Sequence, residues 1–130
     1  MKQRIYCIIY NEKYGYLVML KYKKNKGVYH QLLTGKLETG ETYLQGIQRE
    51  VKEEINIIID EIRFKELLIT PFGKYYYLRL LDEEINNIQI SNEHVGYTFV
   101  KKQYLLPLIL VKSTKDVPHN VQLIIDKNMI

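Results

Sequence analysis

A change in the spacing of the apolar residues after Thr42 constrains the fold of this chain more than any other feature. From there the apolar residues recur at intervals of three and four, which is the period of a helix with one buried stripe, at Leu44, Ile47, Val51 and Ile55. Thr42 and Gln45 have the spacing of a capping box, and Asn56 can take the left-handed conformation that ends a helix. The pattern therefore predicts one amphipathic helix between Thr42 and Asn56.

Runs rich in β-branched and aromatic residues flank this helix on both sides. We expect strands over residues 4–10, 16–22, 28–33, 57–59, 63–70, 74–81 and 97–100. Thr34 and Gly35 should interrupt the third strand before a loop over residues 37–40. Further helices are expected around residues 103–111 and from Asp116 through Ile125. Strands interleaved with helices favour a mixed α/β fold, which we assign to a single domain over residues 1–130.

Composition excludes several classes of protein. An apolar fraction of 46% with 26% charged residues is ordinary for a globular chain, so disorder, collagen and coiled coil are excluded. The longest apolar stretch, residues 105–111, contains Pro107 and is too short to span a bilayer. No small-residue cleavage site follows the apolar residues 5–10, so we expect no signal peptide. Cys7 is the only cysteine, which fits a reducing, cytoplasmic setting.

Three carboxylates gather on one side of the predicted helix. Glu53 and Glu54 both lie within about 60° of Glu50 around the helix axis, mainly opposite the apolar stripe. Like charges at these spacings each cost about 0.2–0.5 kcal/mol, and the helix dipole disfavours them near the C-terminal end. A solvated acidic face is one interpretation, and a bound cation is the other. Hard oxygen ligands of this kind suit Mg²⁺, with Mn²⁺ as a substitute.

The spacing around these carboxylates matches a known pattern. Gly35 is followed after five residues by Glu41, and after seven more by the run Arg49-Glu50-Val51-Lys52-Glu53-Glu54. Residues 35–57 thereby resemble the Nudix box, the signature of Nudix hydrolases. They depart from it at Asn56, where the family usually has Gly. Asn accepts the left-handed geometry, so this departure leaves the chemistry untouched.

The resemblance implies the Nudix fold, an α/β/α sandwich around a mixed sheet in which the box forms a loop–helix–loop. It also implies hydrolysis of a nucleoside diphosphate linked to another group. The metal ligands that it implies are Glu50, Glu53, Glu54 and a backbone carbonyl at Gly35 or its neighbour. Arg49 would orient Glu50 and its neighbours, while Gly40 and Glu41 would shape the box.

Two glutamates are candidates for the catalytic base. Glu53 is the first choice because it lies among the implied ligands, although other Nudix members use a glutamate from a later loop. Glu93 begins the segment Glu93-His94-Val95-Gly96-Tyr97, which resembles the Glu-His-x-x-Tyr segment of several Nudix branches. By that resemblance Glu93 is a further ligand or base, and an ordinary polar loop is the alternative. We expect His94 to be a loop residue with a local hydrogen bond.

Three residues before or beside the box are candidates for substrate binding. Lys21 follows the second strand, where many family members place a basic residue near the phosphates, and a solvated surface lysine is the alternative. His30 and Gln31 immediately precede the box, so either can line a substrate pocket or simply pack within a strand. The usual Pro-Gly-Gly and upstream Trp of the family are missing, which leaves the corresponding base contact unassigned.

The segments together indicate a class of substrate. Residues 31–35, the box without its last Gly, and residues 93–97 resemble the bacterial dihydroneopterin triphosphate/dATP pyrophosphatase branch. We therefore expect an Mg²⁺-dependent pyrophosphohydrolase for a nucleoside triphosphate-like substrate, with dinucleoside polyphosphates left open. RNA 5′-end hydrolysis calls for a larger basic surface than a net charge of +4, and a non-catalytic nucleotide-binding module would usually lack a box carboxylate. No membrane partner is expected, and a homodimer is left open.

Overall fold

The computed structural model describes residues 3–110 and 116–130. Its strands are β1 (Arg4–Asn11), β2 (Gly15–Lys23), β3 (Gly27–Gln31), β4 (Leu33–Lys36), β5 (Lys65–Thr70), β6 (Gly73–Arg79) and β7 (Gly96–Val100). Its α-helices are α1 (Tyr43–Ile55), α2 (Asp82–Ile85), α3 (Lys102–Leu110) and α4 (Asp116–Asp126), and a 3₁₀ turn, η1, spans Glu61–Arg63.

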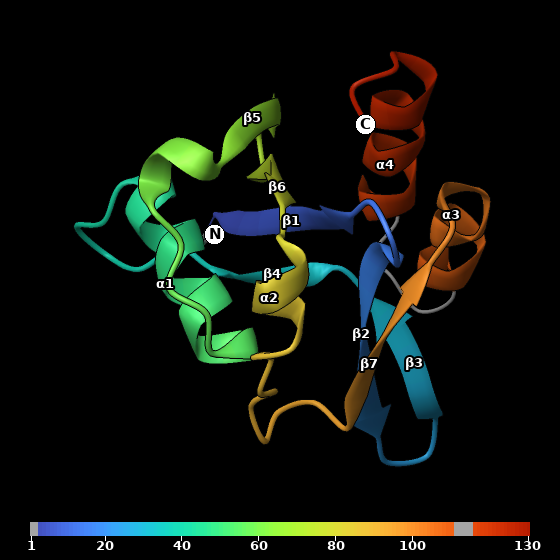
Figure 1. Cartoon of the computed structure of the whole chain (residues 1–130). Helices are drawn as coiled ribbons and strands as arrows, with labels where there is room; N and C mark the ends of the chain where they lie inside the picture. The colour runs from blue at the N-terminus through green and yellow to red at the C-terminus, as the bar shows by residue number, and fades with distance from the viewer. Residues whose placement is uncertain (1–2, 111–115) are drawn as a thin grey trace.

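Within the described residues the strands form one mixed sheet with helices on both faces. The main strand order is β3-β2-β1-β6-β5, while β4 pairs with β1 and β7 pairs with β2. β1 runs parallel to β6 and antiparallel to its other neighbours. Helix α1 covers one face of the sheet, and α3 and α4 cover the other (Figure 1). This is the α/β/α sandwich that the resemblance to the Nudix family implies.

Strand β1 supplies both hydrophobic cores, because successive side chains of a strand point to opposite faces. Ile5, Cys7 and Ile9 pack beneath α1, whereas Ile8 packs against the core under α3 and α4. Burial raises the pKa of the Cys7 thiol, so this cysteine is a small core residue, as expected, and not a nucleophile.

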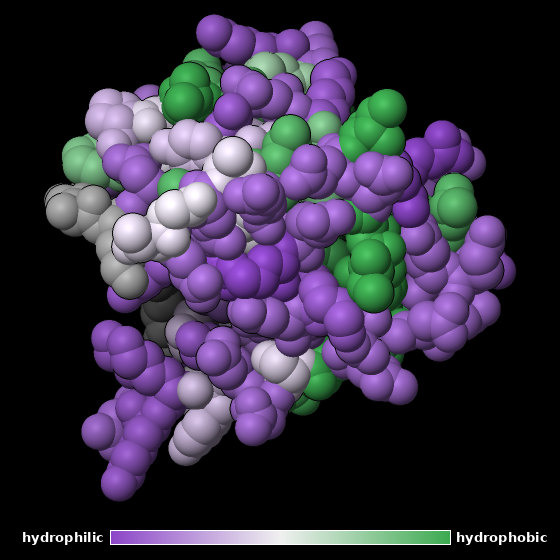
Figure 2. Space-filling view, turned by 90° about the vertical axis from the view of Figure 1, so that its left-hand side faces the viewer, coloured by the Kyte–Doolittle hydropathy of each residue, from purple (hydrophilic) through white to green (hydrophobic). Residues whose placement is uncertain are grey.

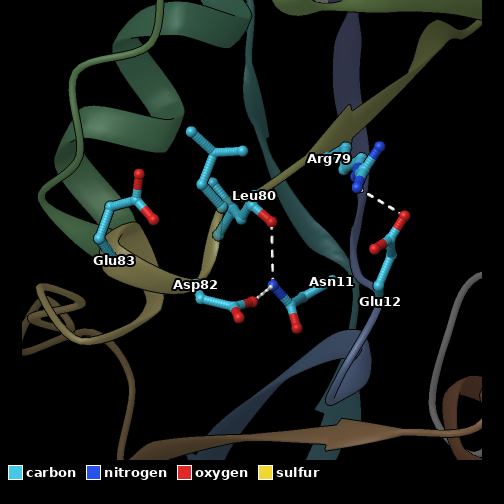
Figure 3. Close-up of a pocket in the computed structure, with 7 residues that line it drawn as sticks. Asn11, Glu12, Arg79, Leu80, Asp82 and Glu83 are labelled. Atoms are coloured by element: carbon cyan, nitrogen blue, oxygen red, sulfur yellow. Dashed lines mark hydrogen bonds and ion pairs between the residues drawn. The ribbon is translucent and has the colours of Figure 1, made fainter.

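The turn from β1 to β2 is held by the buried side chain of Asn11. Its amide oxygen accepts hydrogen bonds from the backbone N–H groups of Lys13 and Tyr14, at 2.9 and 3.1 Å. Its amide nitrogen donates to Leu80 O at 3.0 Å and to Asp82 Oδ1 at 2.8 Å, across a hollow of about 240 Å³ (Figure 3). Both polar atoms of the Asn11 side chain thus have partners within the protein. We therefore assign this hollow to the structure of the turn and not to a binding site.

The expected third strand is two strands in the structure, which corrects its boundaries. β3 pairs with β2, the chain changes partner at Leu32, and β4 then pairs with β1. Thr34 and Gly35 lie inside β4, opposite Tyr6 and Ile5, so they do not break the extended run. The residues from 37 to 40 form the expected loop. The glycine in this strand marks a close approach by another part of the chain.

Helix α1 begins and ends as the sequence predicts. Thr42 Oγ1 accepts from Gln45 N at 3.1 Å, and the Gln45 side chain accepts from Thr42 N at 2.9 Å, which completes the capping box. Asn56 ends the helix in the left-handed region, with φ 61°. A Cβ at Gly46 would lie 2.8 Å from Leu37 Cδ1 and 2.9 Å from Ile5 Cδ1. The glycine therefore allows the helix to approach the sheet closely.

Two of the three carboxylates on α1 are buried, which corrects the expectation of an acidic side opposite the apolar stripe. Glu50 is 6% exposed and Glu54 is 5% exposed, whereas the side chain of Glu53 is 52% exposed. Glu50 and Glu54 lie within about 60° of the buried Ile47 around the helix axis, so they share its inward side. The surface over α1 is mostly hydrophilic, with separate small apolar areas (Figure 2).

The expected strand over residues 57–59 is wrong. Ile57 and Ile59 are buried and Ile58 is 76% exposed, but no strand forms there. The alternation of buried and exposed side chains instead reflects an irregular segment. It packs two side chains into the core, but its backbone does not pair with another strand. The turn η1 follows, capped by Asp60, and both η1 and α2 were missed by the sequence patterns.

The remaining expected elements are confirmed within about two residues. Helix α3 contains Pro107 and ends at Leu110, while Val111, its expected last residue, lies outside the described residues. Helix α4 begins at Asp116, as predicted, and ends at Asp126. Among the described residues no helix is both long enough and apolar enough to span a membrane.

Candidate active site

A cleft of about 380 Å³ opens between β4, α1 and the loop that precedes β7. Most residues that the sequence indicates for the site line this cleft: Lys21, Gln31, Gly35, Arg49, Glu50, Glu53, Glu54 and Glu93. The fold brings them together because β4 carries the start of the box into the sheet and α1 then runs across the same end of that sheet.

Gly35 is required by the position of Glu50. A Cβ at residue 35 would lie 1.9 Å from Cδ of Glu50 and 2.1 Å from its Oε1. The carboxylate of Glu50 therefore occupies the space that a side chain at position 35 would fill. Burial raises the pKa of Glu50, and the adjacent Arg49 offsets this only in part.

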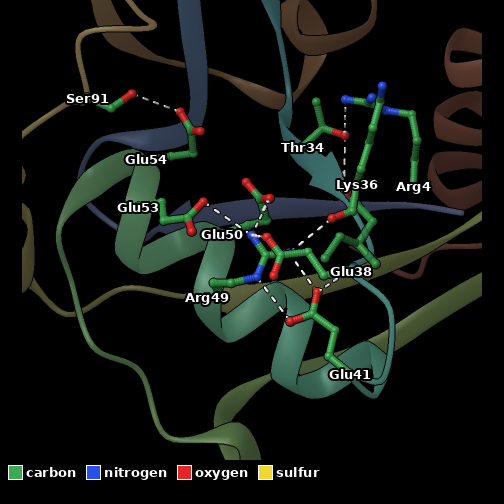
Figure 4. Close-up of polar contacts among 11 residues, drawn as sticks. Arg4, Thr34, Lys36, Glu38, Glu41, Arg49, Glu50, Glu53, Glu54 and Ser91 are labelled. Atoms are coloured by element: carbon green, nitrogen blue, oxygen red, sulfur yellow. Dashed lines mark hydrogen bonds and ion pairs between the residues drawn. The ribbon is translucent and has the colours of Figure 1, made fainter. Parts of the chain in front are cut away.

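Arg49 is the centre of the hydrogen bonds in the box (Figure 4). Its Nη2 and Nε donate to the two carboxylate oxygens of Glu41, at 2.6 and 3.0 Å. Its Nη1 donates to Glu50 Oε1 at 2.8 Å and to Glu53 Oε2 at 3.2 Å. A further bond from Nη2 reaches the carbonyl oxygen of Lys36 at 3.0 Å. One guanidinium thus joins the end of β4, the loop before α1 and two carboxylates of α1.

Glu41 and Gly40 shape the loop ahead of α1. The hydrogen bonds from Arg49 lower the pKa of Glu41, which also accepts from Glu38 N at 2.8 Å. Gly40 has a φ of 85°, a conformation that residues with a Cβ adopt rarely. The loop therefore has a defined path into the capping box of α1.

Glu54 is held by a residue from a distant loop. Nδ1 of His94 lies 2.7 Å from Oε2 of Glu54, and the two side chains are 3% and 6% exposed. Ser91 Oγ donates to the same oxygen at 3.2 Å. Burial alone raises the pKa of Glu54, but the contacts with His94, Ser91 and Glu93 outweigh it and leave the pKa below its usual value. Glu54 is therefore held as a carboxylate.

The side chain of His94 is a site residue that sequence reasoning missed. Its backbone N–H bonds Ser91 O at 3.2 Å, which is the local hydrogen bond expected of it. Its ring, however, turns inward between Glu54 and Gln31, with Nε2 lying 3.2 Å from Nε2 of Gln31. Glu93, its neighbour, is exposed at the mouth of the cleft. No local pattern distinguishes which of two adjacent loop residues points into a cleft.

His30 does not line the cleft, which corrects its assignment as a substrate-binding candidate. It lies on β3 opposite Leu20, next to Gln31 opposite Met19. Because neighbouring strand residues face opposite sides, only one of the two can point into the cleft. Gln31 does so, as does Lys21 on β2.

Arg4 on β1 and Lys36 on β4 also line the cleft, although neither was singled out from the sequence, and so does Thr34, of which only the backbone was implied as a ligand. Thr34 Oγ1 donates to Ile5 O at 2.9 Å and accepts from Arg4 Nη2 at 3.3 Å. The pairing of β1 with β4 brings them together, and that pairing has no signal in the local sequence.

The donor set of the cleft fits a hard divalent cation. Glu50, Glu53 and Glu54 offer carboxylate oxygens within one cleft. Because Gly35 has no side chain, the carboxylate of Glu50 can lie against the backbone of β4. Over residues 3–110 and 116–130, no three acidic, histidine or cysteine side chains already converge on one metal position. Arg49 and His94 hold these carboxylates instead, so binding a cation requires the side chains to shift.

The family of the chain follows from a direct comparison. A family model for the NUDIX domain matches residues 2–120, which include the box, the whole sheet and the loop that carries His94. The chain therefore belongs to the Nudix family, whose members are hydrolases that act on pyrophosphate bonds in nucleoside diphosphate-linked substrates and generally use a divalent metal. No curated protein matches the chain significantly.

Solved structures show the same fold. A MutT protein from Methanosarcina mazei Go1 is 19% identical, with a TM-score of 0.67 over 98% of this chain and 94% of that one. An Ap4A hydrolase from C. elegans is 17% identical, with a TM-score of 0.66 over 99% and 98% of the two chains. A bifunctional NMN adenylyltransferase/ADP ribose pyrophosphatase from Francisella tularensis, solved with AMP and a Mn ion, is 14% identical, with a TM-score of 0.71 over 97% and 41%.

Proposed function

We propose that this protein is an Mg²⁺-dependent pyrophosphohydrolase that cleaves a phosphoanhydride bond in a nucleoside triphosphate-like substrate. The observation that carries this proposal is the cleft, which Glu50, Glu53 and Glu54 line together and where Arg49 and His94 contact them. A non-catalytic binding module would have no need of this complete carboxylate set.

Glu50, Glu53, Glu54 and the backbone carbonyl at Gly35 are the groups that would hold the metal. When bound, the metal would neutralise charge on the phosphate oxygens and lower the pKa of the attacking water. Arg49 contacts Glu50, and His94 contacts Glu54, so both carboxylates are kept within the cleft before a metal binds. Mn²⁺ prefers similar oxygen ligands and should replace Mg²⁺.

Glu53 is the proposed base that takes the proton of the water. Its side chain is 52% exposed, so it reaches the open part of the cleft where water and substrate enter. Glu93 is the second candidate, since it lies at the mouth of the same cleft. Whichever carboxylate is the base, the proton would move from the oxygen of the attacking water to a carboxylate oxygen.

The proposed substrate is dihydroneopterin triphosphate, dATP or another nucleoside triphosphate. The likeness of residues 31–35 and 93–97 to the dihydroneopterin triphosphate/dATP branch supports this choice. A dinucleoside polyphosphate is the second candidate, favoured by the fold likeness to the C. elegans Ap4A hydrolase. The RNA 5′ end comes third, because the chain carries a net charge of only +4.

A substrate panel tests the proposal. The full chain is incubated with Mg²⁺ and with dihydroneopterin triphosphate, nucleoside triphosphates, Ap4A, ADP-ribose or triphosphorylated RNA, and the released phosphate species are measured. We expect pyrophosphate or a monophosphate from a triphosphate substrate, loss of activity with EDTA, and recovery with Mg²⁺ or Mn²⁺. Release from no compound would favour the binding module, and activity that survives chelation would contradict the metal.

We further propose that the chain acts as a single domain in the cytoplasm. Both hydrophobic cores share one sheet, which supports a single folding unit over residues 1–130. Cys7 is free and buried, as suits a reducing compartment. One cooperative unfolding transition is expected, and size-exclusion chromatography with light scattering would decide between a monomer and a homodimer.

A further inference from the structure

Two cations lie directly opposite each other at the end of the β1–β4 pair. Arg4 and Lys36 are register partners in this antiparallel ladder, so their side chains leave the sheet on the same face. Figure 4 shows the side chains of these two register partners extending away from Glu41. Like charges directly opposite in a sheet are destabilising, so this pair is not explained by the stability of the strands.

Neither cation has an acidic partner in the part of the chain that the structure describes. Over residues 3–110 and 116–130, no aspartate or glutamate forms an ion pair with Arg4 or Lys36. Arg4 is oriented by neutral groups instead, namely the hydroxyl of Thr34 at 3.3 Å and the side chain of Tyr6. The guanidinium is therefore held in place, and no carboxylate among the described residues pairs with its charge.

The pair shares its cleft with the carboxylates of the box. Arg4 and Lys36 line the same hollow of about 380 Å³ as Glu50, Glu53 and Glu54. The cleft thus combines carboxylates suited to a divalent cation with basic groups suited to an anion. Arginine and lysine together match the oxygens of a phosphate group, through paired N–H donors and a compact charge.

A terminal phosphate fits this arrangement better than an internal one. A phosphate at the end of a polyphosphate chain carries more negative charge and bears no further group that would need room beyond it. A phosphate linked on both sides, through ester or anhydride bonds, carries one negative charge, and the molecule continues beyond it into a further phosphate, nucleoside or sugar. Two adjacent cations without a carboxylate partner therefore match the free end of a polyphosphate.

We propose that Arg4 and Lys36 form a binding subsite for the terminal phosphate of a nucleoside polyphosphate, which selects substrates with a free phosphate end over substrates capped at both ends. This inference rests on the proposed function and narrows its substrate class. Thr34 is a positioning residue of the subsite, because it holds the guanidinium of Arg4.

The test compares two kinds of substrate in the full chain. The variants are Arg4→Gln, Lys36→Gln and, as a matched control, Lys65→Gln, which removes the same charge from an exposed position on β5 outside the cleft. We measure kcat and KM for the best triphosphate of the panel and for ADP-ribose and Ap4A. The ratio of kcat/KM for triphosphate to kcat/KM for the capped compounds should fall about tenfold in each site variant, through KM. The control should keep the wild-type ratio.

A binding arm separates this inference from the proposed function. Inorganic tripolyphosphate is titrated into each protein by calorimetry, and both site variants should bind it about tenfold more weakly than the wild type and Lys65→Gln. If the wild type hydrolyses nothing, the proposed function fails, while the titration still decides the subsite. Equal tripolyphosphate binding in all four proteins would overturn the subsite. So would a wild-type preference for capped substrates.

Discussion

His94 and Glu54 face each other inside the cleft, with Nδ1 of the imidazole 2.7 Å from Oε2 of the carboxylate. The other ring nitrogen lies 3.2 Å from the side-chain nitrogen of Gln31, 63 residues away in the sequence. One buried ring therefore joins a strand, the box helix and the loop before β7. Partners of this kind orient metal-binding carboxylates, so His94 should control the position of Glu54.

Amide variants of His94 can separate its two contacts. An asparagine side chain places its nitrogen near the position of Nδ1, whereas a glutamine places it near Nε2. We expect His94→Asn to keep Mn²⁺ affinity within about threefold of the wild type, and His94→Gln and His94→Ala to lose about 10–100-fold in affinity and in kcat. Mn²⁺ titration followed by electron paramagnetic resonance, together with steady-state kinetics, measures both effects.

The order of these variants is the decisive result. A role in folding alone would move the melting temperature of all three variants without sorting their metal affinities by the position of the amide. If His94→Asn and His94→Ala bound Mn²⁺ equally well at equal stability, the contact with Glu54 would not position the carboxylate.

Gly35→Ala should inactivate the enzyme by displacing Glu50. The added Cβ would lie 1.9 Å from Cδ of Glu50, so the carboxylate must leave its place above β4. We expect kcat to fall at least about 100-fold, with a loss of about 1–3 kcal/mol in the free energy of unfolding from overpacking. Gly96→Ala is the control, since its Cβ would meet only the Leu20 side chain, at 3.3 Å, and it should stay near wild type in both measurements. Wild-type turnover in Gly35→Ala would contradict the place of Glu50 in the site.

Helix α1 and the residues on it could be predicted because their signals are local. The apolar period, the Thr42–Gln45 cap and Asn56 all act within one or two turns, and each is present in the structure. The box spacing likewise places Arg49 beside Glu50 and Glu53 without any knowledge of the sheet.

The residues that sequence reasoning missed depend on contacts between distant segments. Arg4 and Lys36 meet only because β1 pairs with β4, and that pairing follows the change of strand partner at Leu32. The burial of Glu50 and Glu54 likewise depends on how closely α1 approaches the sheet, which Gly46 allows. A helical wheel shows which residues share a side but not how deep that side lies.

Glu53→Gln and Glu54→Gln should both lower turnover yet differ in stability. Each removes a proposed ligand, and Glu53 is also the proposed base, so we expect kcat to fall at least about 100-fold in both. Glu53 is half exposed, and its loss relieves repulsion by Glu50, so the melting temperature should stay the same or rise slightly. Glu54→Gln breaks a buried contact with His94 and should cost about 1–3 kcal/mol. Wild-type rates in both variants would remove the proposed catalytic centre.

The ion pair between Arg63 and Glu84 should make the free energy of unfolding depend on pH in the acid range. Both guanidinium Nη atoms of Arg63 donate to Glu84, each at 2.7 Å, which ties η1 to α2. These bonds lower the pKa of Glu84 below its reference value of 4.5. Because the folded-state pKa is depressed, the stabilisation is complete above the unfolded-state pKa and is lost as the pH falls through the folded-state pKa.

Glu84→Gln should therefore cost about 1–2 kcal/mol of unfolding free energy at neutral pH, after allowance for the partly exposed guanidinium. At acid pH, below the reference value of 4.5, the difference from wild type should shrink, because wild-type Glu84 becomes protonated as the pH falls through its lowered pKa. Urea unfolding at both pH values measures the effect. Glu83→Gln, at the exposed neighbouring position, is the control and should change stability little at either pH. A difference between Glu84→Gln and wild type that stayed constant with pH would show that the charge of Glu84 is not what stabilises this contact.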